Sequence, residues 1–510
     1  MDKSAEDWFF GGKFSLWIVI AVLILIGAGI RFYDLTDLPL DFHPTRQLYS
    51  ALKARGMYFN LLPAEVGGTQ AEIAINQWRS IQEIEPPVLE FLTALLYRAL
   101  GEHLWYARAL SILFWLAGSI PLFLLARRLS GNNGALVALG FYLFVPYGLI
   151  ASRSFQPDPL MVSLMISALW AIAEWQAKGG WKWAITAGLL TGATLFVKNV
   201  AVFPLFFGIL LTTLPGNFRQ KLHDPQYWSI AGLAALPTLA YTFYGLFGAG
   251  FLGQQFAFRF FPNLWLDPVF YLRWKEQIDA VIGFGTFMFA LTGMFLAPRP
   301  GRGLLQGIWI GYVIYSMTFA YHTITHDYYQ LMLIPICALS LAPVVETAAR
   351  KIQENFTNRP TLRLAQGFFA IMLLVAMSIQ VWNARVELAR KDYRAEAQRW
   401  ASIGSQIDQL GNPGPVLTIA EDYGYRLAYW GWQEVEAWLD AGDLNLRSLD
   451  GREIDLITKF LEKANGKTYL VVTQMNKLDA QPEIKTFVLE NFPEVISTDD
   501  FVVFDLGNQE

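Results

Sequence analysis

Residues 152–213 have the sequence SRSFQPDPLMVSLMISALWAIAEWQAKGGWKWAITAGLLTGATLFVKNVAVFPLFFGILLTT. This stretch contains three apolar runs, near 159–177, 183–197 and 199–214, that are separated by short polar turns. An α-helix rises about 1.5 Å per residue, so about 20 apolar residues cross the roughly 30 Å hydrocarbon core of a membrane. Charged residues collect at the turns, where water is within reach. The stretch therefore predicts helices that cross a membrane.

Similar apolar runs recur along most of the chain. Hydrophobic residues make up 54% of the 510 residues and charged residues only 16%, which excludes a disordered chain and an ordinary soluble protein. We therefore predict a polytopic α-helical membrane protein with about eleven spans. Besides the three above, they lie near 14–30, 105–126, 133–151, 227–247, 278–297, 303–321, 328–346 and 363–382.

The charges divide the chain into two parts. Residues 383–510 hold 13 basic and 22 acidic side chains, whereas residues 1–382 hold 26 basic and 21 acidic ones. We predict a membrane domain at 1–382, which includes an external loop at 31–104, and a small extracytoplasmic α/β domain at 383–510. The overall net charge of -4 argues against nucleic acid as a partner. In the tail, strand-like runs at 415–420, 468–473 and 501–506 are separated by helical segments near 452–464 and 481–490.

Cations in the short loops predict the orientation. Segment 86–101, PPVLEFLTALLYRALG, is short and carries Glu90 and Arg98, so we predict a helix that lies in the membrane interface. With the N-terminus in the cytoplasm, every cytoplasmic loop then contains at least two cations, as Lys and Arg enrichment on that side requires. The tail and the unusual polar residues face outside. The cytoplasmic cations are Arg127, Arg128, Lys178, Lys182, Arg219, Lys221, Arg299, Arg302, Arg350, Lys351, Arg359 and Arg363.

The external loop opens with the densest polar cluster of the membrane domain, RFYDLTDLPLDFHPTRQLYS at 31–50. Asp41 is a candidate general base, and His43 a candidate proton shuttle or metal ligand. Arg46 offers a planar fork that suits phosphate oxygens. Each residue also has a structural alternative: a helix cap for Asp41, a hydrogen-bonded polar side chain for His43 and an interfacial arginine for Arg46.

Four more candidates lie beside the predicted spans. Glu85 and Glu90 flank the start of the interfacial helix and could orient an acceptor, although acids are also favoured at helix N-termini. Asp158 lies between two prolines. It is a candidate second carboxylate of the site, with a cap of the following helix as the alternative. Lys198 is the only charge between Lys182 and Arg219. It is a candidate phosphate contact, with extension to the interface as the alternative.

The remaining candidate substrate contacts are Arg153, Arg259, His326, Asp327 and Tyr328. Arg259 belongs to the aromatic loop 248–277, which we predict as a lid over a lipid head group or a membrane-surface helix. The last three lie in the turn YHTITHDYYQL at 321–331, where a substrate contact and ordinary interfacial hydrogen bonding are both open. No spacing of metal ligands stands out, so we assign no metal residue and no certain cofactor, and leave a divalent metal open.

The order of these motifs resembles the C-type glycosyltransferase superfamily, in particular glycosyltransferase family 39 with the protein O-mannosyltransferases and aminoarabinose transferases. The resemblance covers nearly all of residues 14–382 and implies the C-type glycosyltransferase fold. It rests on RFYDLTDLPLDFHPTRQ (31–47), EPPVLEFLTALLYRALG (85–101), ARRLSG (126–131), SRSFQPDPL (152–160), GLLTGATLFVKN (188–199) and HDYYQLMLIP (326–335).

The resemblance implies an enzyme of the cell membrane that transfers a sugar from a polyprenyl phosphate-linked donor, with inversion, to an acceptor at the external face. The acceptor, whether protein, lipid or polysaccharide, is not implied. Family members usually carry an adjacent Asp-Glu pair where this chain has His43 and Pro44, so the base is either Asp41 or His43. The other implied roles are phosphate contacts for Arg46 and Lys198, a substrate contact for Glu85 and a second carboxylate for Asp158.

A polytopic transporter or flippase of a lipid-linked or small polar substrate is the alternative class. Such proteins often contain internal repeats and helices interrupted at mid-depth. This chain has no convincing repeat, and its unusual polar residues collect at one predicted face. The sequence therefore favours the enzyme.

Overall fold

The structure is a computed structural model that describes residues 13–63, 65–213, 223–253, 259–299, 301–356, 358–389, 392–412, 414–449, 451 and 454–507. The predicted loop cations Arg219 and Lys221, and residues 254–258 of the predicted lid, lie outside the described residues. The chain forms two compact units. The helical unit consists of Met1–Leu35, Glu83–Pro86 and Arg108–Arg390, and the mixed unit of Thr36–Gln82, Pro87–Ala107 and Lys391–Glu510. The predicted domain boundary at residue 382 stays a prediction, because compactness does not test independent folding.

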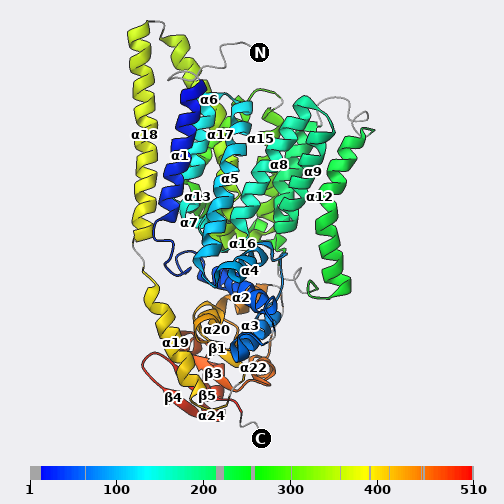
Figure 1. The fold of residues 1–510 in the computed structure, drawn as a ribbon, viewed down its shortest axis with the longest axis vertical. Helices are drawn as coiled ribbons and strands as arrows, with labels where there is room; N and C mark the ends of the chain where they lie inside the picture. Colours follow the sequence, from blue (N-terminus) through cyan, green and yellow to red (C-terminus); the bar gives the residue numbers. More distant parts are fainter. Residues whose placement is uncertain are drawn as a thin grey trace. The chain divides into compact units, whose positions relative to one another are not determined.

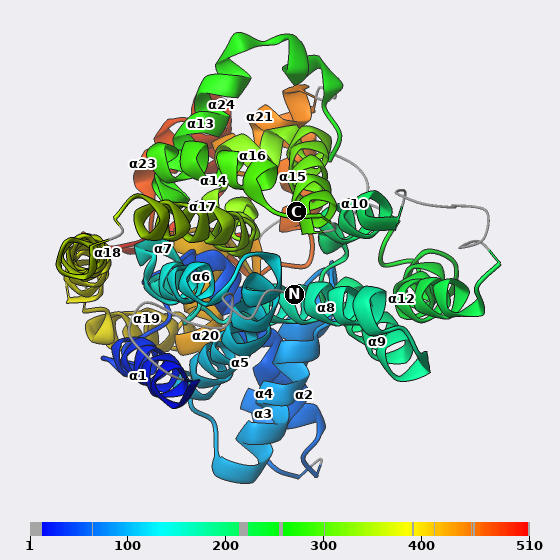
Figure 2. The ribbon, with the colours of Figure 1, turned by 90° about the horizontal axis from the view of Figure 1, so that it is seen from above.

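Most long helices of the helical unit are apolar, run roughly parallel to one another (Figure 1) and are seen nearly end-on in Figure 2. A helix occupies each of the eleven predicted segments, because an apolar segment in lipid must satisfy its backbone hydrogen bonds internally. The elements are α1 (Lys13–Phe32), α5 (Trp105–Leu129), α6 (Asn132–Phe144), α7 (Pro146–Ala151), α8 (Asp158–Lys178), α9 (Trp181–Val197), η2 (Asn199–Ala201), α10 (Val202–Thr213), α12 (Pro225–Phe243), η3 (Tyr244–Gly248), η4 (Pro262–Leu266), α13 (Pro268–Ile282), α14 (Phe284–Leu296), α15 (Gly301–Thr318), α16 (Ala320–Thr325), η5 (Asp327–Gln330), α17 (Leu333–Asn355) and α18 (Arg359–Ala389).

The length and exposure of these helices identify a multi-pass membrane protein. Among the described residues, six helices are long and apolar enough to span a membrane, or seven if the bent pair α13–α14 counts as one span. In the most apolar window of α18, none of the residues is buried by protein. An apolar helix with such a surface needs lipid around it. The predicted number of eleven spans stays a prediction, because several helices are shorter.

Two of the predicted spans are broken helices. Segment 133–151 divides into α6 and α7 at Pro146, whose ring cannot continue the preceding helix. Segment 278–297 is the larger difference, because α13 and α14 meet there at an angle of 91°. Gly283 between them has φ 79°, which a glycine adopts without the steric cost that other residues carry. The apolar pattern contained no signal for that bend.

Close contact between α14 and α17 depends on Gly293. A methyl group at this position would overlap the backbone carbonyl of Ser340, whereas no described atom lies within 4 Å of the corresponding position at Gly285 of the same helix. We expect Gly293→Ala to lower the free energy of unfolding by about 1–3 kcal/mol, because backbone cannot move aside as a flexible side chain does. Thermal unfolding of the purified protein measures this. Equal midpoints for Gly293→Ala and the control Gly285→Ala would contradict the tight helix contact.

The mixed unit combines helices with one sheet. Helix α2 begins at Pro44. Segment 86–101 contains the predicted helix, α4, which is 13 residues or about 20 Å long and too short to span a membrane. The elements are α2 (Pro44–Asn60), α3 (Gly68–Ser80), α4 (Val88–Leu100), α19 (Arg394–Asp408), β1 (Val416–Ile419), η6 (Glu421–Gly424), α20 (Tyr425–Trp430), β2 (Val435–Ala437), α21 (Ala441–Leu449), α22 (Leu456–Ala464), β3 (Tyr469–Val472), α23 (Met475–Asp479), α24 (Pro482–Asn491), β4 (Glu494–Ser497) and β5 (Val502–Asp505).

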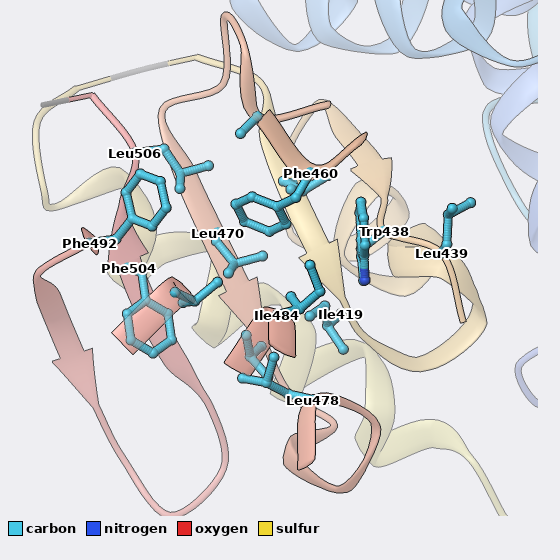
Figure 3. Packing of buried hydrophobic residues seen from close by; sticks show 14 residues of the cluster. Ile419, Trp438, Leu439, Phe460, Leu470, Leu478, Ile484, Phe492, Phe504 and Leu506 are labelled. Atoms are coloured by element: carbon cyan, nitrogen blue, oxygen red, sulfur yellow. The ribbon is translucent and has the colours of Figure 1, made fainter. Parts of the chain in front are cut away.

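The sheet has the strand order β2-β1-β3-β5-β4. Strand β1 is parallel to β2 and β3, while β3–β5 and β5–β4 are antiparallel. Leu417, Leu470 and Phe504 are paired in register across the three central strands and are fully or almost fully buried. Figure 3 shows Leu470 and Phe504 within the hydrophobic cluster, together with Phe460 of α22 and Ile484 of α24. The predicted α/β tail is confirmed in its three central strands, but the edge strands β2 and β4 were missed.

Candidate functional site

A buried ammonium group joins two carboxylates in the helical unit. Lys198 Nζ donates hydrogen bonds to both side-chain oxygens of Asp158, at 2.9 Å each, and lies 3.6 Å from Glu85 Oε1. Lys198 is 8% exposed and Asp158 3% exposed. Because the low-dielectric surroundings strengthen the attraction between opposite charges, this cluster is held firmly. The structure thus brings together three predicted residues that are far apart in the sequence.

Local backbone structure explains the position of each member. Asp158 is the first residue of α8, and Pro157 and Pro159 restrict the chain on both sides. Lys198 has an extended conformation, with φ -156° and ψ 107°, between α9 and η2. The interruption of the apolar helices at Lys198 therefore turns its side chain toward the start of α8. The capping alternative for Asp158 is not observed as a side-chain cap, since its carboxylate binds Lys198.

A cavity of about 140 Å³ adjoins this cluster. Its charged lining residues are Glu85, Lys198 and Arg259. The predicted substrate contact Glu85 and the predicted phosphate contact Lys198 thus line the same cavity as Arg259 of the predicted lid. The rest of the wall is apolar or uncharged, which keeps the charges in a poorly hydrated place. The uncharged polar lining residues are Asn199, Thr238, Tyr241, Thr242 and Tyr329.

Sequence reasoning missed the polar face of α12. Thr238, Tyr241 and Thr242 are three and four residues apart, which places them on one side of the helix facing the cavity. Polar residues at this spacing within an otherwise apolar segment could have indicated this face from the sequence. Asn199 and Tyr329 were also missed, although each directly follows a predicted site residue.

An aromatic and histidine cluster borders the cavity. The ammonium of Lys198 lies 5.7 Å from the ring centroid of Tyr328, which η5 positions. His326 packs edge-on against Tyr328 at 5.5 Å and stacks with His322 at 5.9 Å. His326 Nδ1 also lies 2.7 Å from the Thr325 hydroxyl. Asp327 begins η5 between them. Of the predicted residues in this turn, Tyr328 therefore lies beside the cation, and His326 packs against Tyr328.

Burial, together with the charges of Arg259 and His326, lowers the pKa of His322 to about 3. Because this folded-state pKa lies below the value of about 6.5 in an unfolded chain, the unfolded chain takes up the proton first as the pH falls. We expect stability to decrease from pH 6.5 downward, by at most about 1.4 kcal/mol per pH unit. His322→Gln should remove that dependence in thermal unfolding between pH 7.5 and 4.5. The same substitution at the exposed His223 is the control. Parallel curves of stability against pH for wild type and His322→Gln would contradict the lowered pKa of His322.

Arg153 lies away from the cavity. Its guanidinium donates to the backbone carbonyl of Asp34 at 3.1 Å, and the side chain is 2% exposed. Nearby, Arg31 Nε donates to the Ser152 hydroxyl at 2.8 Å. These bonds tie the end of α1 to the turn before α8. The geometry therefore supports a positioning role for Arg153, and its predicted substrate contact stays a prediction.

The mixed unit holds the predicted base candidates and Arg46. Asp41 accepts a hydrogen bond from Gln47 Nε2 at 3.3 Å. His43, directly before α2, has a left-handed backbone with φ 43° and packs edge-on against Phe42 at 4.6 Å. A non-glycine residue in this region is uncommon and such strain often accompanies a functional site. The Arg46 guanidinium lies 5.5 Å from the Tyr49 ring centroid.

Glu90 is buried inside the same unit. Its carboxylate accepts a hydrogen bond from the Ser50 hydroxyl at 2.7 Å, and the residue is 5% exposed. The solvated helix N-terminus that served as the structural alternative is therefore not its environment. Lys53, which sequence reasoning passed over, is also buried and lies 4.4 Å from the Tyr49 ring centroid. Lys53 follows Ser50 by three residues and Tyr49 by four, so all three lie on one face of α2. This spacing could have identified Lys53 from the sequence.

The described residues contain no group of three or more His, Cys, Asp or Glu side chains that could hold a metal ion. The carboxylates of Asp158 and Glu85 are instead occupied by a lysine.

Comparisons with known proteins agree with the fold. Residues 84–244 match the family model described as dolichyl-phosphate-mannose-protein mannosyltransferase. The crystal structure of ArnT from Cupriavidus metallidurans in the apo state is similar with TM-score 0.58 and 16% identity, over 96% of this chain and 98% of that one. ArnT bound to undecaprenyl phosphate matches with TM-score 0.58 and 15% identity, over 98% of this chain and 99% of that one.

More distant matches have the same architecture. The oligosaccharyltransferase of Archaeoglobus fulgidus matches with TM-score 0.51 and 13% identity, over 91% of this chain and 70% of that one. Among proteins of curated function, none matches the chain significantly. The likeness of these structures confirms the C-type glycosyltransferase fold that the motifs implied. The chain is therefore a multi-pass membrane protein with the C-type glycosyltransferase fold.

Proposed function

We propose that this protein is a membrane glycosyltransferase that moves a sugar, with inversion, from a polyprenyl phosphate-linked donor to an acceptor at the external membrane face. The observation that carries the proposal is the buried ion pair of Lys198 with Asp158, where Lys198 lines a cavity together with Glu85 and Arg259. The match to ArnT, which has been crystallised with undecaprenyl phosphate, supports a lipid-linked donor.

The chemistry requires a base for the acceptor and cations for the leaving phosphate. As the acceptor hydroxyl attacks the anomeric carbon, its proton passes to the base, and the bond between that carbon and the phosphate oxygen breaks. The electron pair stays with the polyprenyl phosphate, whose charge increases. Cations that already point at this phosphate stabilise the transition state more than the ground state. The base in this proposal is Asp41, with His43 as the alternative, and Arg46 is a further phosphate contact.

The cavity wall suits such a phosphate. Arg259 supplies a guanidinium fork, and Lys198 supplies an ammonium whose contact with Glu85, at 3.6 Å, is its weaker one. A phosphate oxygen can replace the Glu85 contact while both hydrogen bonds to Asp158 remain. Glu85 is then available to an acceptor or donor hydroxyl. Asp158 holds the ammonium in place, which is the role proposed here for the second carboxylate.

The test is transfer from a panel of radiolabelled polyprenyl-phosphate sugars to membrane acceptors by the purified full-length protein. Incorporation with one or more donors, lost in Lys198→Met but kept in a control such as Lys485→Gln, whose lysine lies in the mixed unit and pairs with Asp479, is the expected result. Absence of transfer with every donor, together with movement of a labelled lipid-linked sugar across liposomes, would overturn the enzyme and favour a flippase. The panel also identifies the sugar.

A further inference from the structure

A second and larger cavity lies at the other end of the helical unit. Its volume is about 820 Å³, and it is formed where α5 and α8 end and α9 and α15 begin. Asp158 begins α8 at the first cavity, and Lys178 ends the same helix at the second one. Twenty residues of α-helix span about 30 Å, which is the thickness of the hydrocarbon core. The two cavities therefore belong to opposite membrane faces.

The wall of this cavity is basic and aromatic. Three cations line it, namely Arg127, Arg128 and Lys178, against one carboxylate, Glu174. Glu174 accepts from Arg128 at 2.6 Å and also pairs with Lys178. Among the described residues, no carboxylate forms an ion pair with Arg127. The wall thus keeps a net positive charge that its own carboxylate does not neutralise.

Aromatic and aliphatic side chains line the same cavity beside its charged residues. Trp170 and Trp183 pack edge-to-face at 5.3 Å, and the ammonium of Lys178 lies 5.1 Å from the Trp183 ring centroid. Leu124 and Leu304 also line the cavity. Tryptophan favours the level of the lipid head groups because its ring is amphipathic. A ligand that fits must have an anionic head beside an apolar body.

We propose that this cavity binds the phosphodiester head group of an anionic membrane phospholipid. Arg127 contacts the phosphate directly, and Arg128 and Lys178 contribute charge that Glu174 only partly balances. A soluble phosphate would gain nothing from the tryptophan pair or the leucines, whereas a phospholipid buries its glycerol and upper acyl chains against them. The proposal is independent of sugar transfer, because none of its residues lies at the first cavity.

The test is retention of dioleoyl-phosphatidylglycerol by the purified full-length protein, measured by native mass spectrometry as the lipid is titrated. Dioleoyl-phosphatidylcholine is the neutral comparison. Each cation near an anionic lipid is worth about fivefold in affinity, so Arg127→Gln combined with Arg128→Gln should weaken retention about 30-fold. Glu174→Gln should strengthen it, because the change releases Arg128 and Lys178. Opposite signs in the two variants cannot come from misfolding alone.

The matched control is Arg350→Gln combined with Lys351→Gln. Arg350 and Lys351 are exposed and pair with Glu354. They follow Glu346 on α17, and Glu346 accepts hydrogen bonds from the first turn of α6, just after the end of α5. The two control substitutions therefore remove the same charge as the test variant, at the same end of the helical unit. Lipid retention should change by about twofold or less. Three results would overturn the lipid site: an equal loss in this control, equal retention of the neutral lipid, or displacement of the lipid by inorganic phosphate at about 10 mM, roughly ten times a millimolar dissociation constant.

Discussion

Asp41→Asn should reduce sugar transfer at saturating donor and acceptor by about 10²–10⁴-fold, the contribution of a positioned general base. Asparagine keeps the size of the side chain and an oxygen that can accept the hydrogen bond from Gln47. It cannot take the proton from the acceptor hydroxyl. The loss should therefore appear in the rate of the chemical step, with donor binding and the thermal unfolding midpoint nearly unchanged.

His43→Asn separates the two base candidates. The left-handed backbone at His43, with φ 43°, suits asparagine better than most residues. If His43 serves to shape the turn before α2, this variant should keep transfer within about tenfold of wild type, far above a variant that lacks its base. Full activity in Asp41→Asn with loss in His43→Asn would move the role of base to His43. Full activity in both would exclude each of them.

Lys198→Met should abolish most transfer and also destabilise the protein. Removing one partner of a buried ion pair leaves an unpaired charge and costs about 3–5 kcal/mol, and Asp158 is 3% exposed. Loss of the cation beside the leaving phosphate should lower the rate by about 10²–10³-fold. Thermal unfolding and single-turnover transfer measure the two effects separately.

A double variant distinguishes catalysis from stability. In Lys198→Met combined with Asp158→Asn both charges are gone, so most of the stability should return while transfer remains absent. Glu85→Gln is a milder control, because its carboxylate lies 3.6 Å from the ammonium and is less buried. Its stability should change by about 1 kcal/mol or less. Recovery of transfer in the double variant would show that Lys198 only supports the fold.

The candidate site could be predicted from the sequence only in part. A charge inside an apolar stretch is costly, and this cost made Lys198 and Asp158 visible as candidates. The same reasoning could not show that they bind each other, because 40 residues separate them. Nor could it distinguish Arg153, which ties backbone segments together, from Arg259, which lines the cavity. In the sequence, both are simply cations in predicted external loops.

The sequence by itself determined the helical membrane fold and the central strands of the tail. Apolar segments of this length leave the backbone no other way to satisfy its hydrogen bonds in lipid. Only the tertiary structure decided the 91° bend at Gly283, the edge strands β2 and β4, and the meeting of Glu85 and Asp158 at Lys198. These features depend on packing between segments far apart in the chain, which local periodicity does not encode.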